Sequence, residues 1–177
     1  QGHEQRDAFT EGELPERLPG TYRFGAWRHS GDFQKLSAKP VPSEVSGNYG
    51  LYFLFDQRLF KEREDPKDAQ GLGLFMQLGW APEDRNDIEH YLGGGLVYFG
   101  PVPGRDDDLA GIAVAHAKFS DRLHPLSHMT QETAIECFYR VQVTPFITLR
   151  PQAMYVVNPG GDGRAALAAG LRFEVKF

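Results

Sequence analysis

The C-terminal end of the chain constrains the fold most strongly. Within Arg164–Phe177 every second residue from Leu167 onward is apolar: Leu167, Ala169, Leu171, Phe173, Val175 and Phe177. The residues between them are small or charged: Ala168, Gly170, Arg172, Glu174 and Lys176. Because successive side chains of a strand point to opposite faces, this segment predicts a strand with one apolar and one polar face. Such a strand suits a soluble sandwich, with its apolar face inward, or an outer-membrane barrel, with that face toward lipid.

The same alternation recurs along the rest of the chain, in segments of about ten residues that are separated by turns. It predicts further strands over Thr21–His29, Asn48–Phe60, Gly71–Trp80, Ile88–Phe99, Leu109–Phe119, Thr133–Val143 and Phe146–Val157. Proline and glycine clusters mark reversals at Pro101–Asp108, Thr144–Pro145 and Asn158–Asp162. The pattern predicts an all-β, antiparallel, up-and-down barrel of about eight strands over residues 21–177, and no helix of useful length. Residues 1–20 are polar and are expected to form an N-terminal arm.

Composition excludes several classes of protein. The net charge of -5 provides no basic surface for nucleic acid. Mean hydropathy is -0.44, and no apolar run approaches the roughly 18 residues that a spanning helix needs. A membrane barrel remains compatible, since half of each spanning strand is polar. The single cysteine, Cys137, excludes an intramolecular disulfide.

The distribution of charged and aromatic residues favours a membrane barrel over a soluble core. The polar faces carry charges in mid-strand, at Asp56, Arg58, Glu136, Arg140, Arg150, Arg172 and Glu174. The apolar faces end in aromatic residues, such as Tyr22, Tyr49, Trp80, Tyr98, Phe119 and Phe177. Aromatic residues at the ends of an apolar face are typical of interfacial girdles. A soluble ligand-binding barrel would show the reverse arrangement, with charges outside and an apolar lumen.

Several short motifs resemble one family of proteins, in the same order along the chain. They are Pro19–Trp27 with Ser30–Phe33, Gly47–Tyr52 with Asp56–Gln57, Gln70–Phe75 with Ala81–Arg85, Gly100–Asp108, Phe119–Asp121, Val143–Pro145 and Tyr155–Gly161. In these motifs the sequence resembles the carbohydrate-selective porins of the OprB type, from Pro19 to Phe177.

The resemblance implies a sixteen-stranded porin of the bacterial outer membrane that passes sugars down a concentration gradient. It also implies a lumen that narrows to a constriction of arginines and carboxylates beside aromatic surfaces. The terminal Phe177 would belong to the signal read by the barrel-assembly machinery. The similarity covers only the C-terminal half of such a porin. Two arrangements follow: part of a longer barrel, completed by more chain, a second chain or an oligomer, or a closed barrel of eight strands.

A path for sugars needs aromatic faces and charged groups that exchange hydrogen bonds with hydroxyls. The candidates on the polar faces are Arg23, Trp27, Asp56, Arg58, Tyr91, Glu136, Arg140, Arg150 and Arg172. The alternative interpretation is that these residues form ion pairs that fill a small lumen and touch no solute.

Other chemistry has little support in the sequence. The carboxylates of Arg105–Asp108 lack the spacing of a calcium loop and are expected to form a solvated turn, and His124 and His128 lack a third metal ligand. No metal, cofactor or catalytic residue is predicted.

Two alternatives to a porin remain: a small barrel that anchors a larger complex, with residues 1–20 as its contact arm, and a lipid-modifying enzyme. The enzyme would use Ser120, Ser127, His116 or His128, but no motif supports it.

The predicted topology also gives an orientation. With both termini in the periplasm, loops 30–46, 81–87, 120–131 and 158–163 lie outside the cell. The connections near Asp65, Gly104 and Pro145 then lie in the periplasm. Expected partners are sugars, outer-membrane lipid and the barrel-assembly machinery.

Overall fold

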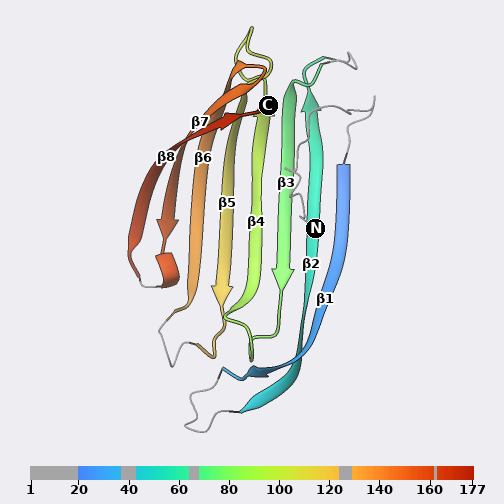
Figure 1. The fold of residues 1–177 in the computed structure, drawn as a ribbon, viewed down its shortest axis with the longest axis vertical. Helices are drawn as coiled ribbons and strands as arrows, with labels where there is room; N and C mark the ends of the chain where they lie inside the picture. The colour runs from blue at the N-terminus through green and yellow to red at the C-terminus, as the bar shows by residue number, and fades with distance from the viewer. Residues whose placement is uncertain (1–19, 37–42, 64–67, 124–128, 162) are drawn as a thin grey trace.

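A computed structural model describes residues 20–36, 43–63, 68–123, 129–161 and 163–177. It contains one eight-stranded antiparallel sheet in which the strands follow one another in chain order (Figure 1). The strands are β1 (Gly20–Gln34), β2 (Glu44–Lys61), β3 (Gly71–Trp80), β4 (Ile88–Phe99), β5 (Leu109–Phe119), β6 (Gln131–Thr144), β7 (Ile147–Val157) and β8 (Ala165–Val175). The all-β, antiparallel, up-and-down prediction is confirmed. The predicted arm lies outside the described residues, except for Gly20, which begins β1.

The described residues contain one helical element, the single 3-10 turn η1 (Pro159–Gly161) between β7 and β8. Asn158, just before it, adopts a positive φ of 57°, and Gly160 within it has a φ of 63°. Among these residues no helix has the length and apolar character needed to cross a membrane.

The register of the strands confirms the predicted faces. One row on the apolar face runs across five strands through Leu74, Leu96, Ile112, Cys137 and Ala153. A neighbouring row on the polar face runs through Asp56, Phe75, Gly95, Ala113 and Glu136. Because a slip of one residue would exchange the two faces of a strand, the alternation in the sequence fixes this register.

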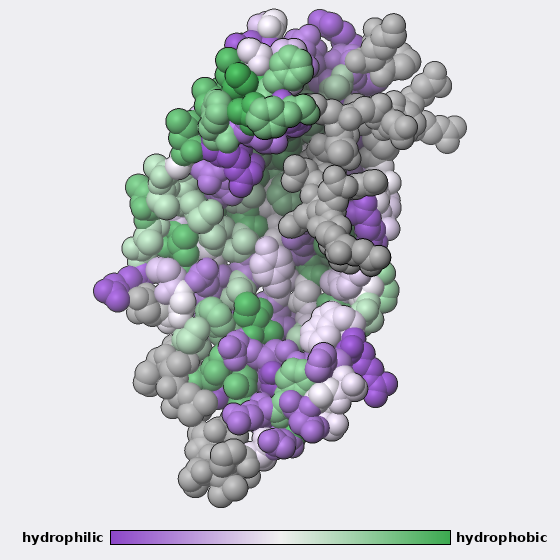
Figure 2. Space-filling view, in the orientation of Figure 1, coloured by the Kyte–Doolittle hydropathy of each residue, from purple (hydrophilic) through white to green (hydrophobic). Residues whose placement is uncertain are grey.

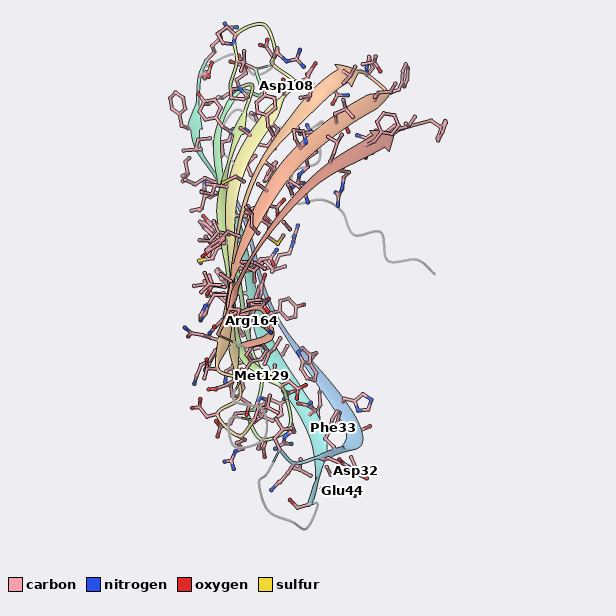
Figure 3. All side chains as sticks on the ribbon, turned by 90° about the vertical axis from the view of Figure 1, so that its left-hand side faces the viewer. Asp32, Phe33, Glu44, Asp108, Met129 and Arg164 are labelled. Atoms are coloured by element: carbon pink, nitrogen blue, oxygen red, sulfur yellow. The ribbon has the colours of Figure 1, made fainter. Side chains whose placement is uncertain are left out.

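The sheet is curved and open. Figure 3 views it from its β8 edge and shows the strands curling out of a common plane. Among the described residues pairing joins only consecutive strands, so β1 and β8 are the two edges. The structure therefore shows an open half-barrel rather than the closed eight-stranded arrangement.

The first hairpin is longer than its sequence pattern predicts. The expected loop 30–46 contributes strand residues at both ends, because β1 continues to Gln34 and β2 begins at Glu44. A bulge between His29 and Asp32 interrupts the alternation there, which hides the strand from a period-two search. The hairpin reaches past the ends of the neighbouring strands in Figure 1.

Burial is inverted relative to a soluble sheet. The buried hydrophobic side chains among the described residues are Val97, Leu109 and Phe119, and the register places all three on the polar face. For Phe119 this corrects the sequence prediction, which put it at the end of the apolar face. The odd-numbered residues of β5 point away from that face, since its even-numbered residues Ile112 and Val114 carry it.

The apolar face is uncovered in this sheet. Phe24 is 73% exposed and Leu171 is 69% exposed, and many other large apolar residues are also exposed. A soluble domain covers such a face with a second layer, because each Å² of apolar surface left in water costs about 25 cal/mol. Hydrophilic residues instead gather at the lower end of the molecule, over the β3–β4 connection (Figure 2). The apolar face must therefore be covered by hydrocarbon or by another protein layer.

Candidate functional site

A groove runs across the polar face of strands β3 to β8. Its lining comes from all six strands: Phe75, Gln77, Val97, Leu109, Ala113, Glu136, Phe138, Arg140, Thr148, Arg150, Arg172 and Glu174. A hollow lined by six neighbouring strands indicates that the sheet curves toward the polar face across β3 to β8. The polar face is therefore the concave one. Of the predicted path residues, the groove brings together Glu136, Arg140, Arg150 and Arg172.

Three arginines stand on three successive strands of this groove. Arg150 of β7 lies directly opposite Arg172 of β8. The β6–β7 pairs Phe138–Gln152 and Val141–Leu149 bracket the positions of Arg140 and Arg150, which brings those two together as well. Like charges on facing strand positions repel, so the cluster needs nearby carboxylates to be stable.

Carboxylates and an aromatic ring provide that compensation. Arg150 Nη2 donates to Glu136 Oε1 at 2.9 Å, and both side chains are only about a quarter exposed. The Arg150 guanidinium also lies over the ring of Phe138, with its central carbon 3.8 Å from the ring centroid. Glu174 lines the same groove from β8.

Aromatic rings of the polar face rest on glycines of neighbouring strands. The pairs in direct register are Trp27 with Gly50, Tyr52 with Gly25, Phe75 with Gly95, and Phe138 with Gly111. A Cβ at any of these glycines would lie 2.2–2.8 Å from an atom of the paired ring. Each ring therefore lies flat on the wall in space that a larger residue would occupy. The sequence shows both residue types, but only the register reveals that they are paired.

The remaining predicted residues lie outside the groove, on strands β1, β2 and β4. Trp27 is 43% exposed and Tyr91 is 36% exposed, and the ring of Tyr91 lies over Gly93 of its own strand. Arg23 and Asp56 are diagonal neighbours on β1 and β2, since Arg23 pairs with Leu54. They form a second, separate part of the polar face.

Arg58 has a different environment from the other predicted residues. It is 6% exposed, and its Nη2 donates to the backbone carbonyls of Ala69 and Gln70. Its guanidinium lies 5.0 Å from the centroid of the Phe99 ring. These contacts tie β2 to the connection that follows it, so Arg58 supports the wall and does not line the groove.

The turn before β5 contains a buried network that the sequence does not reveal. Asp108 is 2% exposed and accepts hydrogen bonds from Arg105 Nη2 at 3.0 Å, Tyr139 Oη at 2.7 Å and the backbone N–H of Gln142 at 2.9 Å. The expectation of a solvated turn is therefore wrong for Asp108, whereas Asp106 and Asp107 are exposed. Burial alone would raise the pKa of Asp108, but the hydrogen bonds from Arg105, Tyr139 and Gln142 outweigh it and lower that pKa. The network fixes the start of β5 against β6, beside the groove.

The residues considered for an enzyme do not form a reactive arrangement in the part of the chain that is described. His116 Nδ1 lies 2.8 Å from the hydroxyl of Thr133, its cross-strand partner. Ser120 is fully buried, and its hydroxyl donates to the backbone carbonyl of Glu83 at 2.5 Å. Ser127, His124 and His128 lie outside the described residues.

Comparison with known proteins identifies the family. The sequence model described as "Carbohydrate-selective porin, OprB family" matches residues 5–177. The chain belongs to this family. It is 26% identical to Porin B of Pseudomonas aeruginosa over 193 aligned positions, which cover 92% of this chain and 42% of that protein.

Solved structures of OprB from Pseudomonas putida have the same fold. The structure at high pH superposes with a TM-score of 0.83 and 24% identity, over 93% of this chain and 46% of the solved one. The structure at low pH gives a TM-score of 0.57 and 23% identity, over 89% and 46% of the two chains. The chain thus spans less than half the length of these relatives.

Proposed function

We propose that this chain forms part of the wall of an outer-membrane channel for the passive, sugar-selective diffusion of carbohydrates. The observation that carries the proposal is the groove of arginines, carboxylates and flat-lying rings on the concave face, opposite an uncovered apolar face. Family membership supports the same function and the same location.

The chemistry of the groove suits a neutral solute covered in hydroxyl groups. Guanidinium groups donate and carboxylates accept, so a sugar exchanges hydrogen bonds with Arg140, Arg150, Arg172 and Glu136 as it passes. Rings that lie flat on glycine offer apolar faces without narrowing the path. Arg23, Trp27, Asp56 and Tyr91 extend this lining toward the β1 edge.

The open edges β1 and β8 need further strands to close a channel. A barrel of about eight strands is filled by its own side chains, whereas about sixteen strands enclose water. The additional strands come from more of the same polypeptide or from a second chain, and the mass of the assembled channel distinguishes the two.

Reconstitution of the assembled channel in a planar bilayer tests the proposal. Sugars are expected to block the ion current reversibly, because a sugar in the groove displaces conducting water. The absence of both conductance and sugar block would contradict the proposal and favour a structural anchor.

Assembly is tested separately, at the C-terminus. We propose that Phe177 contributes to the signal read by the barrel-assembly machinery, and its side chain is fully exposed. Phe177→Ala is expected to lower the amount of folded protein in outer-membrane fractions, whereas Lys176→Ala serves as the neighbouring control. Equal amounts of both variants in that fraction would contradict this role.

A further inference from the structure

Phe138 lines the groove and contacts its surroundings on two sides. On one side its ring occupies the space over Gly111, the residue opposite it on β5. A Cβ at Gly111 would lie 2.4 Å from Phe138 Cζ and 2.6 Å from Cε1. On the other side the ring supports the guanidinium of Arg150 at 3.8 Å. The three residues form a stack of backbone, ring and guanidinium on strands β5, β6 and β7.

The stack determines where a long, flexible side chain points. Arg150 Nε is buried and makes no hydrogen bond among the described residues, so hydrogen bonding at that atom does not set the plane of the guanidinium. Glu136 accepts a hydrogen bond only from Nη2, so the guanidinium can still rotate about that single contact. Repulsion from Arg172, directly opposite, would push the group away from the wall. The ring of Phe138 is the surface that holds the plane.

Tyr52, another ring on the polar face, lacks this role. Tyr52 lies over Gly25 in the same geometry, in direct register across β1 and β2. The cation–ring contacts of the described residues are those of Arg150 with Phe138 and of Arg58 with Phe99, so Tyr52 supports no cation. Tyr52 therefore provides a matched comparison for a ring on glycine without an arginine.

We infer that Phe138, seated on Gly111, is a positioning residue that holds Arg150 flat against the wall and thereby sets the sugar preference of the path. The inference rests on the proposed function, because it names the residue that makes one sugar contact effective. A fixed guanidinium presents two N–H groups to a pair of neighbouring sugar hydroxyls, whereas a freely rotating one must lose that freedom on each encounter.

The test uses single-channel recordings of the assembled channel, with Phe138→Leu, Phe138→Tyr and Tyr52→Leu as variants. Phe138→Leu is expected to raise the half-blocking sugar concentration by about fivefold, in line with the usual strength of a partly desolvated cation–ring contact. Conductance in salt alone is expected to change by less than about twofold. Phe138→Tyr keeps the ring face and is expected to restore the block. Tyr52→Leu removes a ring on glycine that supports no arginine, and is expected to weaken the block less than Phe138→Leu does.

A second experiment, in a channel that lacks the Arg150 guanidinium, distinguishes a positioning role of Phe138 from a general packing role. In an Arg150→Gln channel, Phe138→Leu is expected to add no further loss of sugar block, because the group it positions is gone. An equal additional loss in that background, or no effect of Phe138→Leu alone, would overturn the inference. Gly111→Ala is expected to reproduce Phe138→Leu, since the new methyl group displaces the ring.

The ion selectivity of the channel tests the positioning role of Phe138 independently of any block by sugars. If sugars do not block the unaltered channel, the proposed function is wrong, but the reversal potential in a salt gradient still reports the position of the Arg150 charge. Phe138→Leu is expected to shift that potential, and Phe138→Tyr to restore it. An unchanged potential in Phe138→Leu would then refute the positioning role.

Discussion

The polar face has two regions that share one way of placing aromatic rings and differ in charge. Near the β1 edge, Trp27 and Tyr52 lie over glycines and are more than a third exposed. In the β6–β8 region, Phe138 lies over Gly111 in the same way but also supports Arg150 within a cluster of arginines. Glycine placement therefore explains the flat rings in both regions, whereas the groove owes its chemistry to the charges. The following variants test whether that division is real.

The largest effect is expected in the turn that supports the charged region. Asp108→Asn removes the charge that Arg105 and Tyr139 face in a buried setting, and is expected to destabilise the assembled protein by about 3 kcal/mol. Urea titration followed by tryptophan fluorescence measures this loss. Asp107→Asn, in the exposed part of the same turn, is the control, and an equal effect of both variants would contradict the account.

The lowered pKa of Asp108 predicts that the stability of the protein depends on pH. Because its folded-state pKa lies below the unfolded value of about 3.9, Asp108 contributes stability that is fully present above that value. The contribution is lost as pH falls through the folded-state pKa. Between pH 7 and 3, Asp108→Asn is expected to lose less stability than the unaltered protein. Parallel curves for the two proteins would exclude Asp108 as a source of the acid sensitivity.

Arg150→Gln is expected to have the next largest effect. It removes the guanidinium held by Glu136 and Phe138, and the half-blocking sugar concentration should rise about tenfold, equivalent to about 1.4 kcal/mol. The same current-block measurement applies. Block at an unchanged sugar concentration would mean that the groove is only an internal ion-pair cluster.

A smaller effect on stability is expected in the region near β1. A Cβ at Gly50 would lie 2.5 Å from Trp27 Nε1, so Gly50→Ala must shift the ring and should cost about 1 kcal/mol in urea titration. At Gly170 the nearest atom would be Gln152 Cγ at 3.6 Å, an ordinary contact, so Gly170→Ala should change stability by less than about 0.5 kcal/mol. Equal costs at the two glycines would refute the pairing of ring and glycine.

The smallest effect is expected at Arg23, on the same polar face but outside the groove. Arg23→Gln should change the half-blocking sugar concentration by less than about twofold, because an exposed charge contributes little. A loss as large as that of Arg150→Gln would erase the distinction between the two regions.

The sequence predicts the strands and their faces because both follow from period-two alternation. Glu136 and Cys137, adjacent in β6, fall on opposite faces as that alternation requires. The period-two pattern does not predict the extension of the first hairpin, because the bulge between His29 and Asp32 breaks the alternation. The sequence pattern places Phe119 on the wrong face because the alternation in β5 is mixed, with His116 and Lys118 on its apolar side.

The site is only partly predictable from sequence, since its chemistry depends on pairing between strands. Arg140, Arg150 and Arg172 are recognisable as polar-face residues, but their assembly into one groove depends on the register of β6, β7 and β8. Arg58 is also recognisable as an arginine of the polar face, yet its guanidinium donates to the backbone carbonyls of Ala69 and Gln70. The burial of Asp108 depends on Tyr139 and Gln142, which lie more than thirty residues away.

The most direct measurement compares the chemical accessibility of two neighbouring positions in intact outer membranes. Cys137 is the single cysteine of the chain and lies on the apolar face, and position 136 lies on the polar face. In the unaltered protein, Cys137 is expected to react with a membrane-soluble maleimide and to resist a charged thiol reagent that is excluded from lipid. With Glu136→Cys in a Cys137→Ser background, rapid reaction with the charged reagent is expected. The reverse order of reactivity would show that the apolar face lines an interior and would contradict the proposed channel wall.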